Sequence, residues 1–184
     1  MKVHQISVFL ENRAGQLAEI TRLLAENEID IRAISIAETA DYGLARMIVD
    51  DAYKASSILL QHGDILSMTP VWAVEVPDRP AGLAELLAVL AEAHVDVEYM
   101  YSLFTHVEGK AYMVFRVSDE AKFKALLDSH GIQTCSAEEL GLKLSTDADR
   151  TSVPTLVSCV NQFINNNGLP IKRILINENA DDTV

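Results

Sequence analysis

The chain has 184 residues, of which 49% are hydrophobic, enough for one medium domain or two small ones but not for a large enzyme. Lys and Arg number 15 against 27 Asp and Glu, and the resulting net charge of -12 repels nucleic-acid phosphates and anionic membrane surfaces. We therefore expect neither nucleic acid nor a membrane as a partner, and we interpret the acidic surface as one that favours solubility.

Cysteine content and the N-terminal residues bear on the compartment. Cys135 and Cys159 are the only cysteines, and neither has a second thiol or a histidine at metal-ligand spacing. The apolar stretch near the N-terminus is soon interrupted by Glu11 and Arg13, so it does not resemble a signal peptide, and no apolar run approaches the length of a membrane span. We expect a cytoplasmic protein with reduced, structural cysteines.

A strand and a helix are expected first. Ile6, Val8 and Leu10 recur at every second position, as on the buried face of a β-strand, and the polar cluster 11–15 ends the strand. The apolar residues that follow recur at helical steps of three and four and should pack on a sheet: Leu17, Ile20, Leu23 and Leu24.

The rest of the first half reads as two strands, a second helix and a further strand. Residues 29–36 predict a strand, 41–43 a hairpin turn, and 44–49 the returning strand. Residues 53–61 predict a helix that ends at Gly63, and Ile65 to Trp72 predict a strand. This last strand leads into the next unit with almost no linker.

The same order of elements then occurs a second time. Residues 12–51 align with 78–117 at a shift of 66 without a gap, and the identities extend through loops as well as helices. The identical pairs include Arg13/Arg79, Leu17/Leu83, Glu19/Glu85, Leu24/Leu90, Asp30/Asp96, Gly43/Gly109 and Met47/Met113. We therefore expect an α+β protein with two βαββαβ units in tandem, each an antiparallel sheet with helices on one face, spanning residues 1–70 and 71–143.

A C-terminal extension follows at 144–184. Its polar start reads as a linker, Pro154 as a helix start, and 171–176 as a strand, so the extension forms a helix and strand that could be half of a third repeat. One helix and one strand cannot bury their apolar faces alone. We expect this segment to dock on the two units or, preferably, at a dimer interface.

The loop that precedes the first helix of each unit has a recognisable pattern: an acidic or amide residue, Arg, a small residue or Pro, Gly, any residue, and Leu. Residues 12–17 and 78–83 both follow it, so the chain resembles a tandem of ACT domains, the small regulatory domains that bind amino acids and related metabolites. Ala14 replaces the usual Pro in the first copy, and Ala81 replaces the usual Gly in the second.

The resemblance implies a small-molecule ligand, most simply an amino acid, held where ACT units pack together. Unpaired N–H groups at a helix start can receive its carboxylate, and glycine lets the backbone approach closely. Side chains of the loop and carbonyls of an edge strand can receive its ammonium group. The expected ligand-binding residues are Asn12, Gly15, Gln16, Leu17 and Ile31 in the first unit, and Asp78, Ala81, Gly82, Leu83 and Val97 in the second.

Each of these assignments has a structural alternative. Asn12 and Asp78 occupy positions where N-caps and turn residues are found, Asp30 and Asp96 fit turn chemistry, and the two loop arginines fit surface ion pairs. We expect no catalytic residues, metal or cofactor, because the histidines are scattered and no phosphate-binding or nucleophile motif occurs. The expected protein is a homodimeric sensor; the alternative is an interaction subunit, without a ligand, of an amino-acid biosynthetic enzyme or a transcriptional regulator.

Overall fold

The computed structural model describes residues 2–11, 13–38, 42–105 and 107–143. In these ranges the chain forms two βαββαβ units, as expected, with antiparallel strands and helices on one face of each unit. The elements are β1 (Lys2–Leu10), α1 (Gln16–Glu26), β2 (Ile31–Glu38), β3 (Gly43–Val49), α2 (Ala52–His62), β4 (Leu66–Pro77), α3 (Gly82–Glu92), β5 (Val97–Ser102), β6 (Lys110–Val117) and α4 (Glu120–Ser129).

All strands belong to a single antiparallel sheet in the order β2-β3-β1-β4-β6-β5. The two units share β4, which pairs with β1 over Leu66–Trp72 and with β6 over Trp72–Pro77. The expected strand from Ile65 to Trp72 therefore continues directly into the second unit. No linker therefore separates the two units, because one continuous strand belongs to both.

The last strand of the second unit is reduced to a short bridge. The Glu75 N–H donates to the Gln133 carbonyl at 3.0 Å, and the Cys135 N–H donates to the Ala73 carbonyl at 2.9 Å. Residues 133–135 lie on the same edge of β4 as β1, just beyond the point where Lys2 of β1 pairs with Trp72. Because β1 occupies this edge of β4 up to Trp72, only the remaining residues of the edge can pair with the second unit's own strand.

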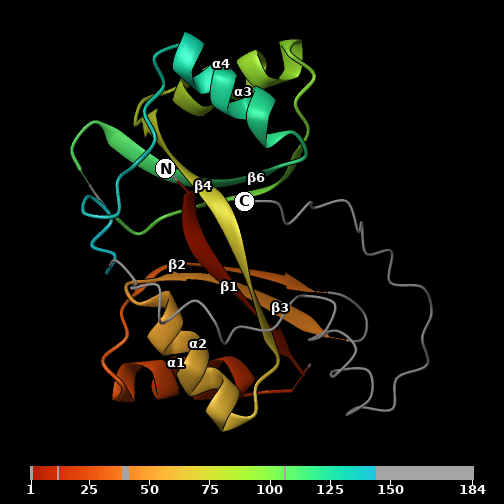
Figure 1. Ribbon diagram of the computed structural model, residues 1–184, viewed down its shortest axis with the longest axis vertical. Helices are drawn as coiled ribbons and strands as arrows, with labels where there is room; N and C mark the ends of the chain where they lie inside the picture. The colour runs from red at the N-terminus through yellow and green to blue at the C-terminus, as the bar shows by residue number, and fades with distance from the viewer. Residues whose placement is uncertain (1, 12, 39–41, 106, 144–184) are drawn as a thin grey trace.

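The sheet bends at β4, so the molecule has four layers (Figure 1): α1 and α2, the first half of the sheet, the second half, and α3 with α4. Each helix pair covers the outer face of its own half and encloses a core. The first core contains Ile6, Val8, Leu10, Ile20, Leu24, Met47 and Leu59, and the second contains Val74, Val76, Leu86, Leu90, Phe115 and Phe123. Bending thus turns the helix-free faces of the two halves toward each other.

A third core fills this seam between the helix-free faces. It joins residues of both units: Val3, Ala33 and Ile48 of the first, and Val71, Ala73, Leu103, Tyr112, Val114, Cys135 and Leu140 of the second. Cys135 is a free thiol there, and burial raises its pKa to about 12, so it is protonated and unreactive at neutral pH, as expected for a structural cysteine.

Buried polar groups also cross the seam. The Gln5 amide donates to the Ser7 hydroxyl and to the Tyr99 hydroxyl, each at 3.0 Å, and its carbonyl accepts from the Tyr101 hydroxyl at 2.8 Å. Gln5 lies on β1 and both tyrosines lie on β5, so these bonds join the two units. A buried amide of this kind requires all its partners, which favours a single alignment of the two halves.

None of the described helices is long and apolar enough to span a membrane. The helix expected from Pro154, the strand expected at 171–176 and Cys159 lie outside the described residues.

Candidate functional site

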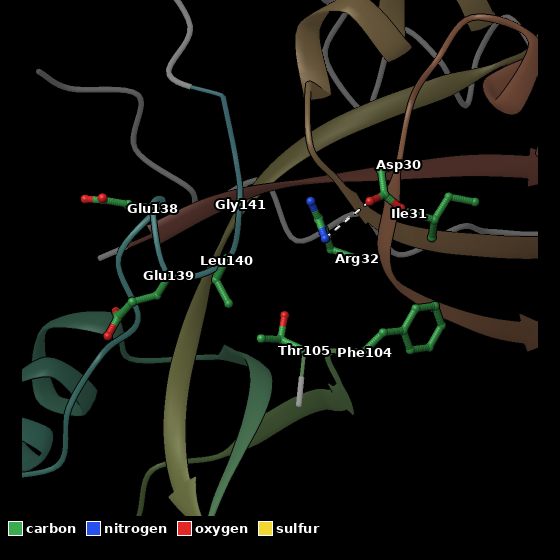
Figure 2. A pocket seen from close by; sticks show the side chains of 9 residues that line it. All are labelled: Asp30, Ile31, Arg32, Phe104, Thr105, Glu138, Glu139, Leu140 and Gly141. Atoms are coloured by element: carbon green, nitrogen blue, oxygen red, sulfur yellow. Dashed lines mark ion pairs between the residues drawn. The ribbon is translucent and has the colours of Figure 1, made fainter. Parts of the chain in front are cut away.

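Two cavities lie at opposite ends of β2. A cavity of about 370 Å³ lies where β2 begins, at Asp30, Ile31 and Arg32 (Figure 2). Another, of about 320 Å³, lies near its other end and is lined by Leu10, Glu11, Arg13, Gln16, Leu17, Ile36 and Gly43. We call the second one the loop cavity, because it is formed by the first of the two loops that the repeat pattern singles out.

The loop cavity adjoins a helix N-terminus that carries no side-chain cap. Helix α1 begins after Gly15, which has a left-handed backbone with φ of 91° and makes no capping bond. In contrast, Asp51 caps α2 by accepting from the Lys54 N–H, and Asp119 caps α4 by accepting from the Lys122 N–H. The first-turn N–H groups of α1 can therefore donate hydrogen bonds to a ligand carboxylate.

Gln16 provides a polar group in this cavity, and Leu17 and Ile36 provide apolar walls. The Gln16 Oε1 atom is buried and has no hydrogen-bond partner among the described residues. A buried carbonyl without a donor is costly, and an ammonium group would satisfy it. Leu17 is 37% exposed and Ile36 48% exposed, although the spacing of Leu17 predicted a position packed on the sheet.

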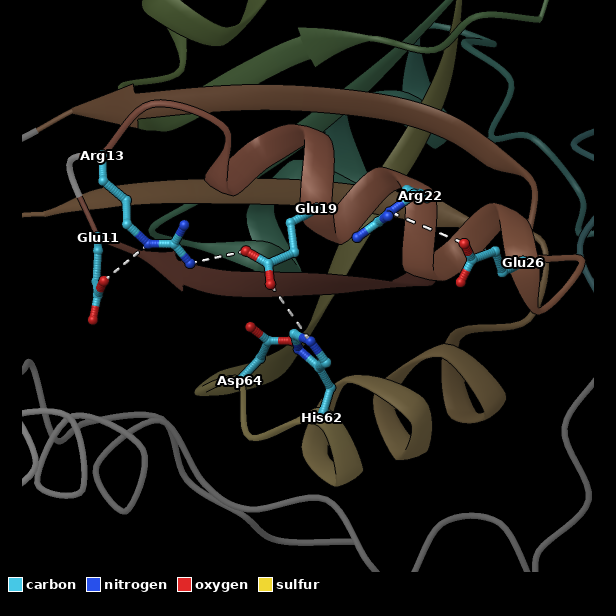
Figure 3. Close-up of polar contacts among 7 residues, drawn as sticks. All are labelled: Glu11, Arg13, Glu19, Arg22, Glu26, His62 and Asp64. Atoms are coloured by element: carbon cyan, nitrogen blue, oxygen red, sulfur yellow. Dashed lines mark hydrogen bonds and ion pairs between the residues drawn. The ribbon is translucent and has the colours of Figure 1, made fainter.

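Ion pairs lead from Glu11 and Arg13, which line the cavity, across α1 to the end of α2 (Figure 3). The Arg13 guanidinium lies 3.2 Å from a Glu11 carboxylate oxygen and 2.8 Å from one of Glu19. The hydrogen bond from Arg13 is the main reason that the pKa of Glu19 is lowered. His62 completes the group, with Nδ1 at 3.0 Å from Asp64 and Nε2 at 3.8 Å from Glu19. Arg13 is therefore a paired surface residue, in agreement with the interpretation of the loop arginines from the sequence.

The second loop repeats this arrangement but closes its interior. Arg79 pairs with Glu85 through two hydrogen bonds of 2.9 and 2.7 Å, as Arg13 pairs with Glu19. At Gly82, the counterpart of Gln16, a Cβ would lie 2.1 Å from the Pro77 carbonyl oxygen. The space that the Gln16 side chain occupies in the first unit is thus taken by backbone in the second.

The structure brings together part of the expected site in each unit. Gln16 and Leu17 line the loop cavity and Gly15 directly precedes them, whereas Asn12 lies outside the described residues. Ile31 instead lines the cavity at the start of β2. In the second unit, Asp78, Ala81, Gly82 and Leu83 lie around the start of α3, and Val97 begins β5. Leu83 and Val97 both pack against the second core.

Ile36 and Gly43 line the loop cavity but were not among the expected residues. Both face the end of β1, since Gly43 pairs with Leu10 and Ile36 lies in register with Ala45, the partner of Val8. Glu38 pairs with Gly43, so alternation counted back from Glu38 places Ile36 on the same face as Gly43. The β-bulge between Ile31 and Ala33 shifts this alternation at the start of β2.

This arrangement, a βαββαβ unit used twice with a ligand-sized cavity at the first loop, defines the ACT class of regulatory domains. The family model of the ACT domain pair matches residues 1–142, and the chain belongs to that family. No curated protein matches the sequence.

The solved structures that are similar to this chain include the following two. Protein BT0572 from Bacteroides thetaiotaomicron is 36% identical, with a TM-score of 0.71, over 78% of this chain and 98% of that chain. The ligand-free regulatory subunit of aspartate kinase from Thermus thermophilus is 16% identical, with a TM-score of 0.52, over 70% of this chain and 90% of that chain. The second similarity shows the fold alone.

Proposed function

We propose that the protein is a non-catalytic regulator that binds an amino acid in the loop cavity. The observation that carries this proposal is the combination of a helix start without a side-chain cap at Gly15 and a Gln16 side chain that lines a cavity of about 320 Å³ and whose buried Oε1 has no hydrogen-bond partner among the described residues. Ligand pockets for small molecules begin at about this size. An α-amino acid carries one group for each of the two polar features.

The ligand's carboxylate would accept from the first-turn N–H groups of α1, where the helix dipole is positive. Its ammonium group would donate to Gln16 Oε1, with Asn12 as a further proposed acceptor. Its side chain would lie against Leu17 and Ile36, which favours an apolar or small amino acid over a charged one. Ion pairing of Arg13 with Glu11 and Glu19 leaves that guanidinium less available to a second charged group.

We assign the second loop a weaker ligand site or none. The Pro77 carbonyl fills the space at Gly82, and Ala81 stands where the first loop has glycine. Asp78, Gly82 and Leu83 remain proposed contacts, with Ala81, for a ligand that binds there from outside. The carbonyls of Ile31 and Val97, at the starts of the edge strands β2 and β5, remain proposed acceptors across a subunit interface.

We further propose a cytoplasmic homodimer in which residues 1–70 and 71–143 act as the two sensing units. The name of the Thermus thermophilus relative, a regulatory subunit, supports a role in controlling another protein. The alternative is an interaction subunit without a ligand, whose partner is an amino-acid biosynthetic enzyme or a transcriptional regulator. Continuity of β4 suits both functions, because it couples the units mechanically.

Thermal denaturation of the full chain against the twenty amino acids separates these alternatives. A ligand present at a hundred times its dissociation constant adds about 2.7 kcal/mol, which raises the midpoint by roughly 5–10 °C for a protein of this size. The sensing proposal requires such a shift with at least one amino acid. If none moves the midpoint, the interaction subunit becomes the better explanation.

A substitution then tests the site itself. Gln16→Met keeps the length of the side chain but removes Oε1, so the ligand-induced shift should fall strongly while the midpoint without ligand stays nearly unchanged. Gln61, exposed on α2, provides the matched control: Gln61→Met should leave the shift intact. An undiminished shift in Gln16→Met would move the ligand away from the loop cavity.

A further inference from the structure

Strand β2 has an outer edge without a strand partner in the described part of the chain. It is an end strand of the sheet, and it pairs there with β3 alone. The register with β3 is regular from Ala33 to Glu38, because the β-bulge is confined to the start of the strand. In an antiparallel pair, every second residue directs its N–H and C=O away from the partner strand. Residues 33–38 therefore present a row of backbone donors and acceptors to an additional strand.

This edge lacks the features by which edge strands usually avoid pairing, namely lysine, proline and other charges. Residues 33–37 read Ala-Ile-Ser-Ile-Ala, with no charge and no proline. Ile36 is 48% exposed, although it is in register with Ala45, which belongs to the first core. An exposed apolar edge of this kind is a site for the addition of a strand.

The other end strand, β5, is a poorer site for an added strand. Its register with β6 is regular only from Tyr99 to Ser102. The side chains of Tyr99 and Tyr101 are already hydrogen-bonded across the seam, and the Phe104 N–H, just beyond the strand, donates to the Arg32 carbonyl at 2.7 Å. The longer regular edge without such contacts is that of β2.

The chain leaves its described part beside the start of β2. The Lys143 N–H donates to the Asp50 carbonyl at 2.7 Å, and the Asp50 N–H donates to the Asp30 carbonyl at 2.9 Å. Asp30 directly precedes β2. The far end of β2 is roughly 25 Å away. Residues 144–170 can span that distance several times over when extended, so the segment that follows them can reach either end of the edge.

That segment, residues 171–176, reads Ile-Lys-Arg-Ile-Leu-Ile and is expected to be a strand, which needs a sheet to pair with. One antiparallel register with β2 places Ile174 opposite Ile36 and Ile176 opposite Ile34. Opposed apolar residues stabilise a strand pair. The segment therefore offers an apolar partner to the residue that is most exposed on this edge.

Charge favours the antiparallel direction over the parallel one. Residue 38 is acidic in the sequence, and the antiparallel register places Lys172 opposite that position. A parallel strand with the same isoleucines paired would place Glu178 there, and like charges in opposed positions are unfavourable. Every described strand pair of the sheet is antiparallel as well.

We propose that the edge of β2 is a docking surface for segment 171–176 of the same chain, which adds as an antiparallel strand with Ile174 opposite Ile36. Ile174 then covers Ile36, and Leu175 points to the opposite face of the sheet. Because Ile36 lines the loop cavity, the added strand stands beside that cavity. The pairing does not depend on the amino acid proposed to bind there.

Disulfide formation between two introduced cysteines tests the register in the full chain. All variants carry Cys159→Ser, whereas Cys135 is kept because burial makes it unreactive. Ile36→Cys combined with Ile174→Cys should form a disulfide within one chain on mild oxidation, since opposed Cβ atoms lie about 4.5–5.5 Å apart. Ile36→Cys combined with Leu175→Cys is the matched control. It should oxidise at least about ten-fold more slowly, because adjacent residues of a strand point to opposite faces.

Hydrogen exchange of the β2 amides, followed by NMR, tests the pairing without new cysteines. The outward N–H groups of residues 33–37 should exchange at least about ten-fold faster in Ile174→Pro than in wild type, because proline disrupts strand pairing. Ala180→Pro lies beyond the paired residues and should leave the exchange unchanged. Outward amides of β5 provide the internal reference for an edge without an added strand.

The proposal is overturned if the outward amides of β2 exchange equally fast in wild type and Ile174→Pro. Protection of β5 in place of β2, or equal oxidation of the two cysteine pairs, overturns it as well. A disulfide between two chains, or protection of β2 that survives Ile174→Pro and grows with protein concentration, would assign this edge to a second copy and reject the proposal.

Discussion

Gly15 and Ala81, which are equivalent in the repeat, both adopt the left-handed backbone conformation directly before a helix. Their φ angles are 91° and 71°, and each residue takes the N-cap position of α1 or α3. Glycine adopts this conformation without strain, whereas alanine does not. The second unit thus keeps the turn geometry of the first loop, even though the left-handed conformation is unfavourable for Ala81.

Ala81→Gly should therefore stabilise the protein by about 0.5–1 kcal/mol, because relief of backbone strain exceeds the added entropy of the unfolded chain. Gly15→Ala should destabilise it by about 1 kcal/mol, and through backbone strain alone, since a Cβ at residue 15 meets no atom within 4 Å. Urea unfolding measures both. The glycine at 63 has φ of 100° and equally open surroundings, so Gly63→Ala should match Gly15→Ala in stability. A neutral or destabilising Ala81→Gly would contradict this account.

The contact between Gly82 and Pro77 makes a second prediction. Gly82→Ala should cost about 2–3 kcal/mol, because the new methyl group overlaps a backbone carbonyl that can move only with the end of β4. The equivalent change in the first unit, Gln16→Ala, removes a side chain whose oxygen has no partner in the described part of the chain and should cost well under about 1 kcal/mol. Chemical denaturation of the two variants compares them directly, and equal losses would mean that the loops are packed alike.

The surroundings of Asp50 lead to a prediction of how the free energy of unfolding changes at low pH. Burial acts to raise its pKa, but hydrogen bonds from Lys143 and from the Asp30 N–H outweigh burial, so the net effect lowers the pKa. A carboxyl group with a lowered pKa stabilises the fold above the pKa of the unfolded chain, near about 3.9, and loses this contribution as the pH falls. Asp50→Asn should cost about 1–3 kcal/mol at pH 7.

The difference between wild type and Asp50→Asn should shrink below about pH 4, where the carboxyl group of the unfolded chain becomes protonated while the native one is still ionised. Unfolding free energies measured from pH 7 down to pH 3 provide the check. As a control, Asp128→Asn alters an exposed pair with Lys124 and should change stability little at any pH. A constant gap between wild type and Asp50→Asn over the whole range would refute the assignment.

Ionisation of Tyr101 should lower the free energy of unfolding at alkaline pH. Its hydroxyl donates to Gln5 across the seam, and burial, with a smaller effect of Tyr99, raises its pKa. Stability from this group is fully present below the unfolded pKa of about 10 and is lost as the pH rises above it. Tyr101→Phe should cost about 1–2 kcal/mol at pH 7 and flatten the alkaline limb.

The measurement is unfolding by urea between pH 7 and pH 11. Tyr53→Phe, at a tyrosine whose ring contacts His4 outside the seam, should leave the alkaline limb as it is in wild type. Parallel loss of stability in wild type and Tyr101→Phe above pH 10 would show that another group controls this limb.

Local signals in the sequence predicted most of the elements. The period-two pattern of Ile6, Val8 and Leu10 predicted β1, and helical spacing placed Ile20 and Leu24 in the core, where both are fully buried. These predictions hold because burial on one face of a strand or helix imposes a period that neighbouring residues carry themselves. The 66-residue repeat then predicted the fold class, and the match to the ACT domain pair over residues 1–142 confirms it.

Only the tertiary structure decided how the two units meet and where cavities remain. Bending at β4 brings Arg32 beside Gly141, and the Pro77 carbonyl fills the space at Gly82, so two loops of similar sequence have different interiors. A loop motif indicates which residues can form a turn, because the backbone conformation of a turn depends on residues that are close in the sequence. Whether the space inside that turn stays open depends on backbone and side chains that reach it from other elements, and no period or motif in the sequence encodes their distances.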